Sequence, residues 1–358
     1  MTSTHSMETG NAQMTALAPN GGHGLAAGPS PAGRPPHPEK SAPPAATIVI
    51  PCYNCAETID ETLESIRNQT VKDFEVVCVN DGSTDATPGK LERWRDKGAF
   101  TLRILDQPNG GVSRARNHAI DEARGECILF LDADDIYHPR FVECLAAGLQ
   151  MADVAYCRLD RDLSRIPNAD PEAVPFRCHP ISVAMEKLLY EMGSYGFYCY
   201  AYRKQILERF SIRFDENTKF GEDREFNWKY LCHCQTAAWL DSPLYGYRLS
   251  PLSATRRVAS WNTDLLKAVK RVEAYLDEWQ CPFSGEFKSY MFPRAMWASA
   301  KKYAVDKNKQ AFDRLRREFD VKTCMMQMTR DKNKWVSVSS WLYLIHPNLY
   351  YWLLGLHG

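Results

Sequence analysis

The stretch at residues 127–135 reads CILFLDADD: five apolar residues, then three aspartates within four positions. A continuously apolar run of this length is typical of a strand that is buried on both faces of a sheet. The polar residues after it would lie at the carboxyl end of the strand, where open α/β sheets bind their ligands. The stretch therefore predicts a central strand and, directly after it, part of a site.

Short apolar runs and amphipathic segments alternate before this stretch. We predict strands at 47–50, 75–79 and 102–105, and helices at 57–68, 86–97 and 113–124. Such alternation predicts an α/β fold with a mixed, mostly parallel sheet flanked by helices. Beyond residue 150 the pattern loosens, with strand-like runs near 154–157 and 237–240 and helical runs near 181–192 and 223–232.

Composition divides the chain into three regions. Residues 1–45 are rich in Gly, Pro, Ala and Ser and have no apolar periodicity, so we expect a disordered tail. Residues 46–256 carry the alternating pattern, and residues 257–358 read as a helical, aromatic-rich extension. The 44 basic and 44 acidic side chains cancel, which argues against nucleic acid as a partner.

Neither a secretory signal nor an apolar stretch of about 18 residues stands out, so we expect a cytoplasmic protein. Between Trp335 and Leu356 the chain is dense in Trp, Tyr and Leu. Such a segment either lies on the inner face of a membrane or packs against the domain or another copy of the chain. Pro347 argues against a single spanning helix, and we favour packing because aromatic residues most often fill cores and interfaces.

The turn after the first predicted strand, PCYNCA at 51–56, bears on two other classes of α/β protein. A dinucleotide-binding domain needs glycines there to bring the backbone close to a pyrophosphate, and this turn has none. Cys52 and Cys55 have the spacing of thioredoxin-like redox sites, which leaves a thiol oxidoreductase as an alternative. That alternative does not account for the acidic run at 132–135.

Two groups of carboxylates are candidates for chemistry. Asp132 and Asp134 lie in one short loop, where a hard divalent cation can be held by carboxylates together with phosphate oxygens; a solvated acidic turn is the other explanation. Glu222 and Asp223 open a predicted helix. They either cap that helix or, if it borders the cleft, supply a carboxylate that takes a proton from an acceptor hydroxyl.

Four segments in order resemble glycosyltransferase family 2 across roughly residues 46–256. They are VIPCYN at 49–54, VNDGSTD at 79–85, NGGVSRARN at 109–117 and LDADD at 131–135. The resemblance implies the GT-A fold and an inverting transfer of a monosaccharide from a nucleotide sugar, with a UDP sugar as the leading donor. It also implies a glycan or lipid-linked acceptor and a role in cell-surface glycan or polysaccharide synthesis. A non-catalytic relative that binds nucleotide or glycan is the alternative.

The resemblance further implies roles for individual residues. The donor-binding positions would be Pro51, Tyr53, Asp81, Asn109, Arg116, Asp132, Asp134, Arg248 and Ser253. Of these, Asp81 would accept the imide N–H of uracil, and Arg248 would offset charge on the leaving diphosphate. Asp134, helped by Asp132, would hold a manganese or magnesium ion. Asp223 would be the general base, with Glu222 as its acidic neighbour.

Overall fold

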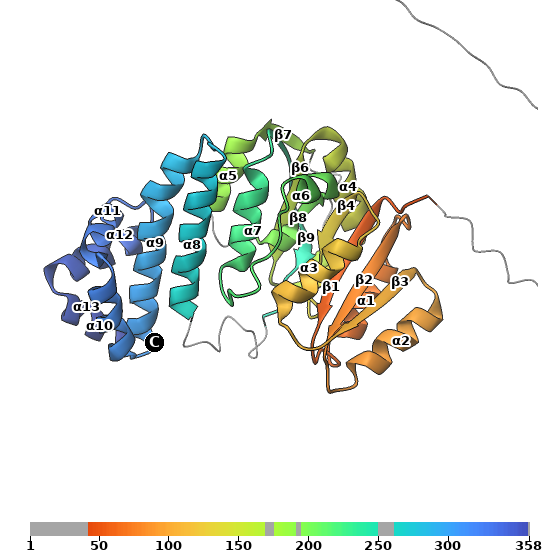
Figure 1. Ribbon diagram of the computed structural model, residues 1–358, viewed down its shortest axis with the longest axis horizontal. Helices are drawn as coiled ribbons and strands as arrows, with labels where there is room; N and C mark the ends of the chain where they lie inside the picture. The colour runs from red at the N-terminus through yellow and green to blue at the C-terminus, as the bar shows by residue number, and fades with distance from the viewer. Residues whose placement is uncertain (1–41, 169–174, 191–194, 250–260, 357–358) are drawn as a thin grey trace, which may run out of the picture. The chain divides into compact units, whose positions relative to one another are not determined.

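One mixed sheet organises the fold in a computed structural model of the chain (Figure 1). The structure describes residues 42–168, 175–190, 195–249 and 261–356. Within them the strands are β1 (Ala46–Cys52), β2 (Phe74–Asp81), β3 (Thr101–Gln107), β4 (Cys127–Phe130), β5 (Ile136–Tyr137), β6 (Val154–Asp160), β7 (Arg177–Pro180), β8 (Tyr200–Arg203) and β9 (Thr236–Gly246). They follow the order β3-β2-β1-β4-β8-β6-β9-β5, and β7 pairs with β9.

The first half of the sheet is parallel. β1 pairs in parallel with both β2 and β4, and β2 pairs in parallel with β3. All residues of β2 and β4 are buried, as the continuous apolar runs in the sequence predict. Because these strands point the same way, the loops that follow β1, β2 and β4 gather at one edge of the sheet.

The second half contains the antiparallel pairs. β8 lies between β4 and β6 and is antiparallel to both, while β6 and β9 are parallel. The short strands β5 and β7 are antiparallel to β9. A mixed α/β sheet was expected, and it is confirmed; the four-residue strand β8 was not predicted, because it lies in an aromatic run without a turn or a period that marks a strand.

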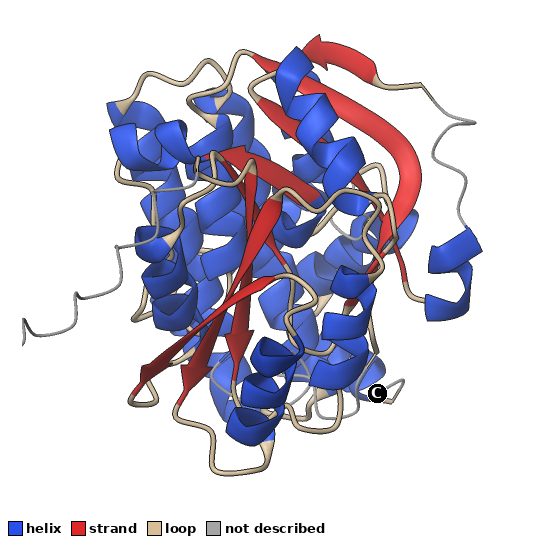
Figure 2. Cartoon of the chain, turned by 90° about the vertical axis from the view of Figure 1, so that its right-hand side faces the viewer, coloured by secondary structure: helices blue, strands red, loops and turns tan. Residues whose placement is uncertain are grey.

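Helices pack around this sheet (Figure 2). Those up to β9 are α1 (Ile59–Arg67), α2 (Thr87–Lys97), α3 (Val112–Glu122), α4 (Phe141–Met151), α5 (Ile181–Tyr190), α6 (Lys204–Arg209) and α7 (Glu222–Leu231), with 3-10 turns η1 (Leu163–Asn168) and η3 (Phe197–Cys199). In α1, Ile59, Leu63 and Ile66 recur at helical spacing and are all fully buried, while the charged residues between them face outward. The packing face of α1 is thus encoded by its periodicity.

In the described part of the chain after the sheet, the helices are α8 (Trp261–Glu278), α9 (Ser284–Val305), α10 (Lys309–Glu318), α11 (Val321–Met328), α12 (Lys334–Ile345) and α13 (Pro347–Gly355). α8 packs on α7, and α9 contacts α5, α8, α10, α11 and α13 (blue in Figure 1). The helical extension expected from the sequence is therefore present. Among the described helices, none combines the length and the apolar character needed to cross a bilayer. Most of the expected tail, residues 1–41, and the expected boundary at 256 lie outside the described residues.

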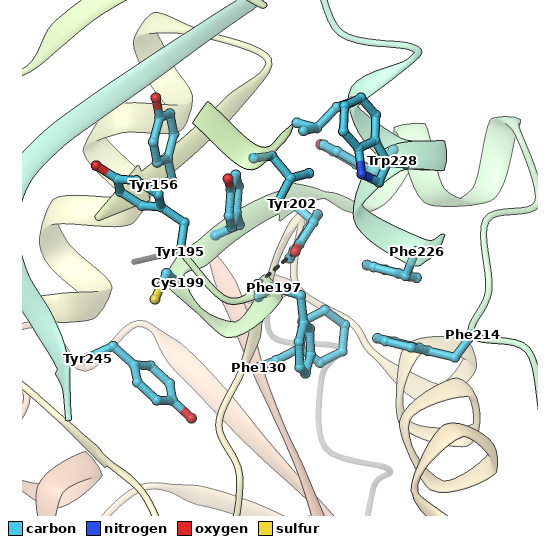
Figure 3. Packing of buried hydrophobic residues seen from close by; sticks show 14 of the residues in the cluster. Phe130, Tyr156, Tyr195, Phe197, Cys199, Tyr202, Phe214, Phe226, Trp228 and Tyr245 are labelled. Atoms are coloured by element: carbon cyan, nitrogen blue, oxygen red, sulfur yellow. Dashed lines mark hydrogen bonds between the residues drawn. The ribbon is translucent and has the colours of Figure 1, made fainter. Parts of the chain in front are cut away.

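An aromatic cluster fills the middle of the domain. Phe130 of β4 has its ring 5.4–5.6 Å from those of Phe197, Tyr202, Phe214 and Phe226. The rings of Phe214 and Phe226 stack in parallel at 4.0 Å (Figure 3). Such ring pairs contribute about 0.5–1.5 kcal/mol each beyond the area that they bury. The cluster therefore joins the central strand to α7 and to the segment before it.

Asn117 fixes that segment to α3. Its side-chain amide donates to the Phe214 carbonyl at 2.9 Å, and its side-chain oxygen accepts from the Phe214 N–H at 2.8 Å. Asn117 is buried, so neither group of Phe214 can turn to water instead.

Asn117→Ala is expected to lower the free energy of unfolding by about 1–3 kcal/mol, because it leaves buried backbone groups without partners. Chemical denaturation measures this loss. The matched control is Asn68→Ala at the exposed C-cap of α1, for which little change is expected. Equal effects of the two substitutions would contradict the structural role of Asn117.

Candidate active site

Cross-links between loops build the site at the carboxyl edge of the parallel strands. The side-chain oxygen of Asn54, after β1, accepts from the backbone N–H of Thr84 at 2.8 Å, after β2. The Ser83 hydroxyl in turn accepts from the N–H of Asn54 at 3.0 Å. Thr62 of α1 donates through its hydroxyl to the Ala133 and Asp135 carbonyls at 3.1 and 2.9 Å. Three polar segments that are distant in the sequence are thereby held at one edge.

The predicted nucleobase positions lie at the ends of β1 and β2. Pro51 is half-buried and pairs in register with Val79, and the ring of Tyr53 is exposed. Asn109, also exposed, donates through its side-chain amide to the Asp81 carbonyl at 3.0 Å. These side chains therefore surround the start of the loop after β2.

Asp81 is enclosed by the loop that follows β3. One carboxylate oxygen accepts from the Gln107 side chain and the Gly110 N–H, each at 2.8 Å, and the other accepts from the Gly111 N–H at 2.8 Å. Asp81 is only 3% exposed. A carboxylate has about four acceptor positions, so one remains after these three bonds. The first role of Asp81 is thus to shape the loop at 109–111, and any contact with a nucleobase would use the remaining position.

Arg116 joins two of the predicted carboxylate groups. One guanidinium nitrogen donates to Asp132 at 2.8 Å, and the other terminal nitrogen lies 3.6 Å from the Glu222 carboxylate. The guanidinium carbon lies 4.4 Å from the ring centre of Phe197 and 5.3 Å from that of Phe214. Aromatic faces attract such a cation. Burial tends to lower the pKa of Arg116, but the charges of Asp132 and Glu222 outweigh burial and raise it.

The acidic loop after β4 is held from β9. The Asp135 carboxylate accepts from the Tyr245 hydroxyl at 2.6 Å and from the Arg248 N–H at 2.7 Å, and Arg248 Nε donates to the Asp134 carbonyl at 2.7 Å. The Arg248 guanidinium also pairs with Glu61 of α1. Arg248, predicted from the sequence, therefore lies against the acidic loop. Asp135 and Tyr245 hold the loop in place, and neither was assigned this role; no spacing rule links residues 110 positions apart.

Asp134 differs from its neighbours in its partners. Among the described residues, no side chain donates a hydrogen bond to its carboxylate, and burial, followed by the charge of Asp132, raises its pKa. Two carboxylates in a short loop provide oxygen ligands, which fit a hard divalent cation. No cluster of three or more metal-binding side chains occurs within the described residues. A cation shared with substrate phosphates requires only one or two carboxylates from the protein.

The predicted acidic pair lies at the start of α7. Gly221 immediately before it adopts φ +86°, a conformation that glycine reaches without strain, and the turn there presents Glu222 and Asp223 in the first turn of the helix. Burial, and then the charge of Asp223, raises the pKa of Glu222 to about 8, although Arg116 opposes this. The structure thus brings together Arg116, Asp132 and Glu222 by direct contact.

A cavity of about 160 Å³ opens beside Asp223. Its lining is largely aromatic and polar: Leu159, Arg161, Leu188, Tyr195, Gly196, Phe197, Tyr198, Asp223, Arg224, Asn227 and Tyr247. Apart from Asp223, none of these residues was predicted from the sequence as part of the site. Apart from Leu159 in β6 and Tyr247 after β9, they come from segments between β6 and β9, whose spatial order depends on the unpredicted strand β8.

Two sequence-based hypotheses have different outcomes. Ser253 lies outside the described residues, so its position is not assigned.

The thiols of Cys52 and Cys55 have the opposite character from a redox pair. The hydrogen bond to Cys52 and burial raise the pKa of Cys55. The hydrogen bond with Cys55 lowers the pKa of Cys52, but Cys78 and burial outweigh this effect, so the pKa of Cys52 is also raised. A nucleophilic cysteine needs a lowered pKa, and the pKa of both thiols is raised.

The chain resembles known glycosyltransferases in sequence and in fold. The family model "Glycosyl transferase family 2" matches residues 47–239. The chain is similar to the uncharacterized glycosyltransferase EpsJ of Bacillus subtilis, with 32% identity over 59% of this chain and 63% of EpsJ. It is also similar to the succinoglycan biosynthesis protein ExoO of Rhizobium meliloti, with 35% identity over 50% of this chain and 53% of ExoO. The matches thus span less than two thirds of each relative.

Among solved structures, residues 1–349 of S. aureus TarS in complex with UDP-GlcNAc have a similar fold. The TM-score is 0.64, with 18% sequence identity, and the match covers 87% of this chain and 90% of that one. The likeness extends beyond the residues matched by the family model, so it includes part of the helical extension. The family model itself covers more than half of the chain, and the protein belongs to glycosyl transferase family 2.

Proposed function

We propose that this protein is an inverting glycosyltransferase that moves a monosaccharide from a nucleotide sugar to an acceptor hydroxyl. One observation carries the proposal: Arg116 holds the acidic loop after β4 next to the carboxylates of α7, and Asp223 borders a cavity. Donor-side and acceptor-side groups therefore meet in one place. The relative ExoO, a succinoglycan biosynthesis protein, supports a role in polysaccharide synthesis.

The donor side would lie over the loops after β1, β2 and β4. A uridine diphosphate sugar is the leading donor: the related fold of TarS carries UDP-GlcNAc, and Asp81 keeps one acceptor position for an imide N–H. Pro51, Tyr53 and Asn109 would border the base. Ser253 would join Arg248 at the diphosphate.

Asp134 and Asp132 would hold a manganese or magnesium ion, which when bound supplies positive charge to the diphosphate oxygens. The protein adds cations of its own. Arg248 is tied to the acidic loop by two hydrogen bonds, and Arg116 is fixed on the Phe197 ring. Both are therefore positioned before the leaving group develops its charge, so little reorganisation is needed during reaction.

Asp223 would be the general base. Of the two carboxylates, Asp223 borders the cavity, whereas Glu222 faces the Arg116 guanidinium, so Asp223 is the one placed to take a proton from an acceptor. Asp223 would take the proton of the acceptor hydroxyl as its oxygen forms a bond to the anomeric carbon. The bond from that carbon to the diphosphate oxygen breaks on the opposite face, and the configuration inverts.

The cavity beside Asp223 would take the acceptor. Its walls carry Tyr195, Tyr198 and Tyr247, whose rings offer flat faces for a sugar ring and hydroxyls for its polar edge. A glycan or the sugar of a lipid-linked glycan fits this chemistry.

The proposal is tested by donor turnover. Purified protein would be incubated with uridine, guanosine and thymidine diphosphate sugars, with and without manganese or magnesium, and released nucleoside diphosphate would be measured. Metal-dependent release from a uridine sugar is the expected result. If the protein bound donor but released no nucleoside diphosphate with any acceptor tested, a non-catalytic relative would be favoured instead.

Asp223→Asn is expected to lower the transfer rate by about 10²–10⁴-fold, the usual contribution of a general base, while donor affinity stays close to that of the wild type. The matched control is Glu222→Gln, which mimics the protonated acid next to it and should retain most activity. Calorimetry of donor binding and a transfer assay separate the two effects. Full activity in Asp223→Asn would rule out this residue as the base.

Asp134→Ala is expected to weaken metal-dependent donor binding by more than about tenfold, which is the lower end of the loss caused by disturbing a metal site. Binding measured without metal should change much less. Asp73→Ala serves as the control, since Asp73 is exposed at the opposite end of β2. If Asp134→Ala lowered donor affinity equally with and without metal, its assignment as a metal ligand would be wrong.

The Glu222 pKa also predicts a pH dependence of stability. Its carboxyl stays protonated in the folded protein up to about pH 8, whereas in the unfolded chain it ionises near its ordinary value of 4.5. Ionisation therefore favours the unfolded state, and this contribution to stability is lost as the pH rises from about 4.5 to 8. Glu222→Gln has no carboxyl to ionise and does not lose this stability. As the pH rises across this range, the thermal midpoint of the wild type should therefore fall relative to that of Glu222→Gln. For Glu57→Gln, at an exposed position, the thermal midpoint should change with pH as it does in the wild type.

A further inference from the structure

Helix α12 buries polar side chains and exposes apolar ones. Its buried side carries two serines, Ser339 and Ser340, together with Val336 and Tyr343. Its outward side carries Trp335, Val338, Trp341 and Ile345, with exposed fractions that run from 56% for Trp341 to 80% for Trp335. These four residues recur every three or four positions and so form one stripe along the helix. A helix that faces water normally has the opposite arrangement.

Helix α13 continues the same pattern. Leu349, Trp352 and Leu356 are exposed, while Tyr350 is buried against the ring of Phe312. α12 and α13 contact each other, and α13 also packs on α9, so their inner sides are already occupied. We call the seven exposed residues of the two helices the α12–α13 face; they are Trp335, Val338, Trp341, Ile345, Leu349, Trp352 and Leu356. Exposed large apolar side chains in this number are typical of an interaction site.

The segment that forms this face, residues 332–356, carries basic residues and no carboxylate. Residues 321–358 hold four basic residues and one acidic residue, a net charge of +3, whereas the rest of the chain therefore carries −3. Lys332 and Lys334 are exposed immediately before Trp335. The side chain of the one acid, Asp331, is 2% exposed and faces Arg294. Within 332–356 no carboxylate offsets the lysines.

We propose that the α12–α13 face binds an anionic lipid surface, with both helices lying in the plane of the membrane interface. Tryptophan, whose ring is apolar and whose N–H is polar, favours that interface, and basic residues beside an apolar stripe are attracted by anionic headgroups. Helices of 12 and 9 residues are about 18 and 14 Å long, too short for a hydrocarbon core of about 30 Å. They can therefore lie on a bilayer but cannot each span one.

Charge also separates this occupant from a second copy of the chain. A symmetric dimer through this face would cover the apolar stripe but would add a second set of the same lysines and no carboxylate from residues 332–356. An anionic surface instead supplies the opposite charge. The inference is independent of the proposed transfer reaction, because the face shares no residue with the candidate active site.

The test is sedimentation of the full chain with vesicles of phosphatidylcholine alone or mixed with phosphatidylglycerol. Wild-type protein should bind the mixed vesicles, and binding should fall in high salt and on neutral vesicles. The triple substitution Trp335→Ser, Trp341→Ser, Trp352→Ser and the double substitution Lys332→Glu, Lys334→Glu should each lower the partition coefficient by at least about tenfold. The control is Trp279→Ser, an exposed tryptophan that follows α8 and lies outside this face.

A second measurement uses the unmodified protein. Brominated lipids should quench the tryptophan fluorescence of the wild type on mixed vesicles, since quenching requires the rings to enter the interface. Absence of binding to mixed vesicles, binding that the triple substitution leaves unchanged, or a dimer in analytical ultracentrifugation that the triple substitution dissolves would each overturn the proposal. Donor turnover without vesicles should be the same in all variants, so loss of lipid binding and loss of transfer are separately visible.

Discussion

The guanidinium of Arg116 is the element on which the candidate site depends. It lies on the Phe197 ring and holds Asp132, which follows the central strand, while it faces Glu222, which begins α7. A buried cation is costly to keep without nearby negative charge, and buried carboxylates are costly without a cation. Arg116 and Asp132 therefore require each other. The aromatic cluster beneath them fixes the distance between the two halves of the sheet.

The donor edge and the acceptor cavity are built by different kinds of contact. The donor edge is a network of hydrogen bonds among loops, in which Asn54, Asp81 and Asp135 each satisfy backbone groups of a neighbouring segment. The cavity is bounded mainly by rings from the segments between β6 and β9. Directional bonds tolerate few replacements, whereas packed rings tolerate changes of size and polarity. Relatives can therefore keep one donor edge while the acceptor side differs.

The sequence predicted the parts of this protein that depend on local patterns. Apolar runs located β1, β2 and β4, and helical spacing located α1, as the buried Ile59, Leu63 and Ile66 confirm. The partners of Asp135 and the enclosure of Asp81 could not be predicted, because both depend on groups far apart in the chain. The same holds for α12: its composition suggested packing, and only the structure separates the buried serines from the exposed tryptophans.

The position of β8 has a consequence for synthesis on the ribosome. β4 ends at Phe130, but its neighbour β8 begins only at Tyr200, so the chain must be extended by about 70 residues before that side of β4 is paired. Until then Ile128 and Leu129 stand at an open strand edge, which is prone to pair with other chains. A truncated or stalled product that ends before β8 should be the form that aggregates, and chaperone binding would be needed most in this interval of translation.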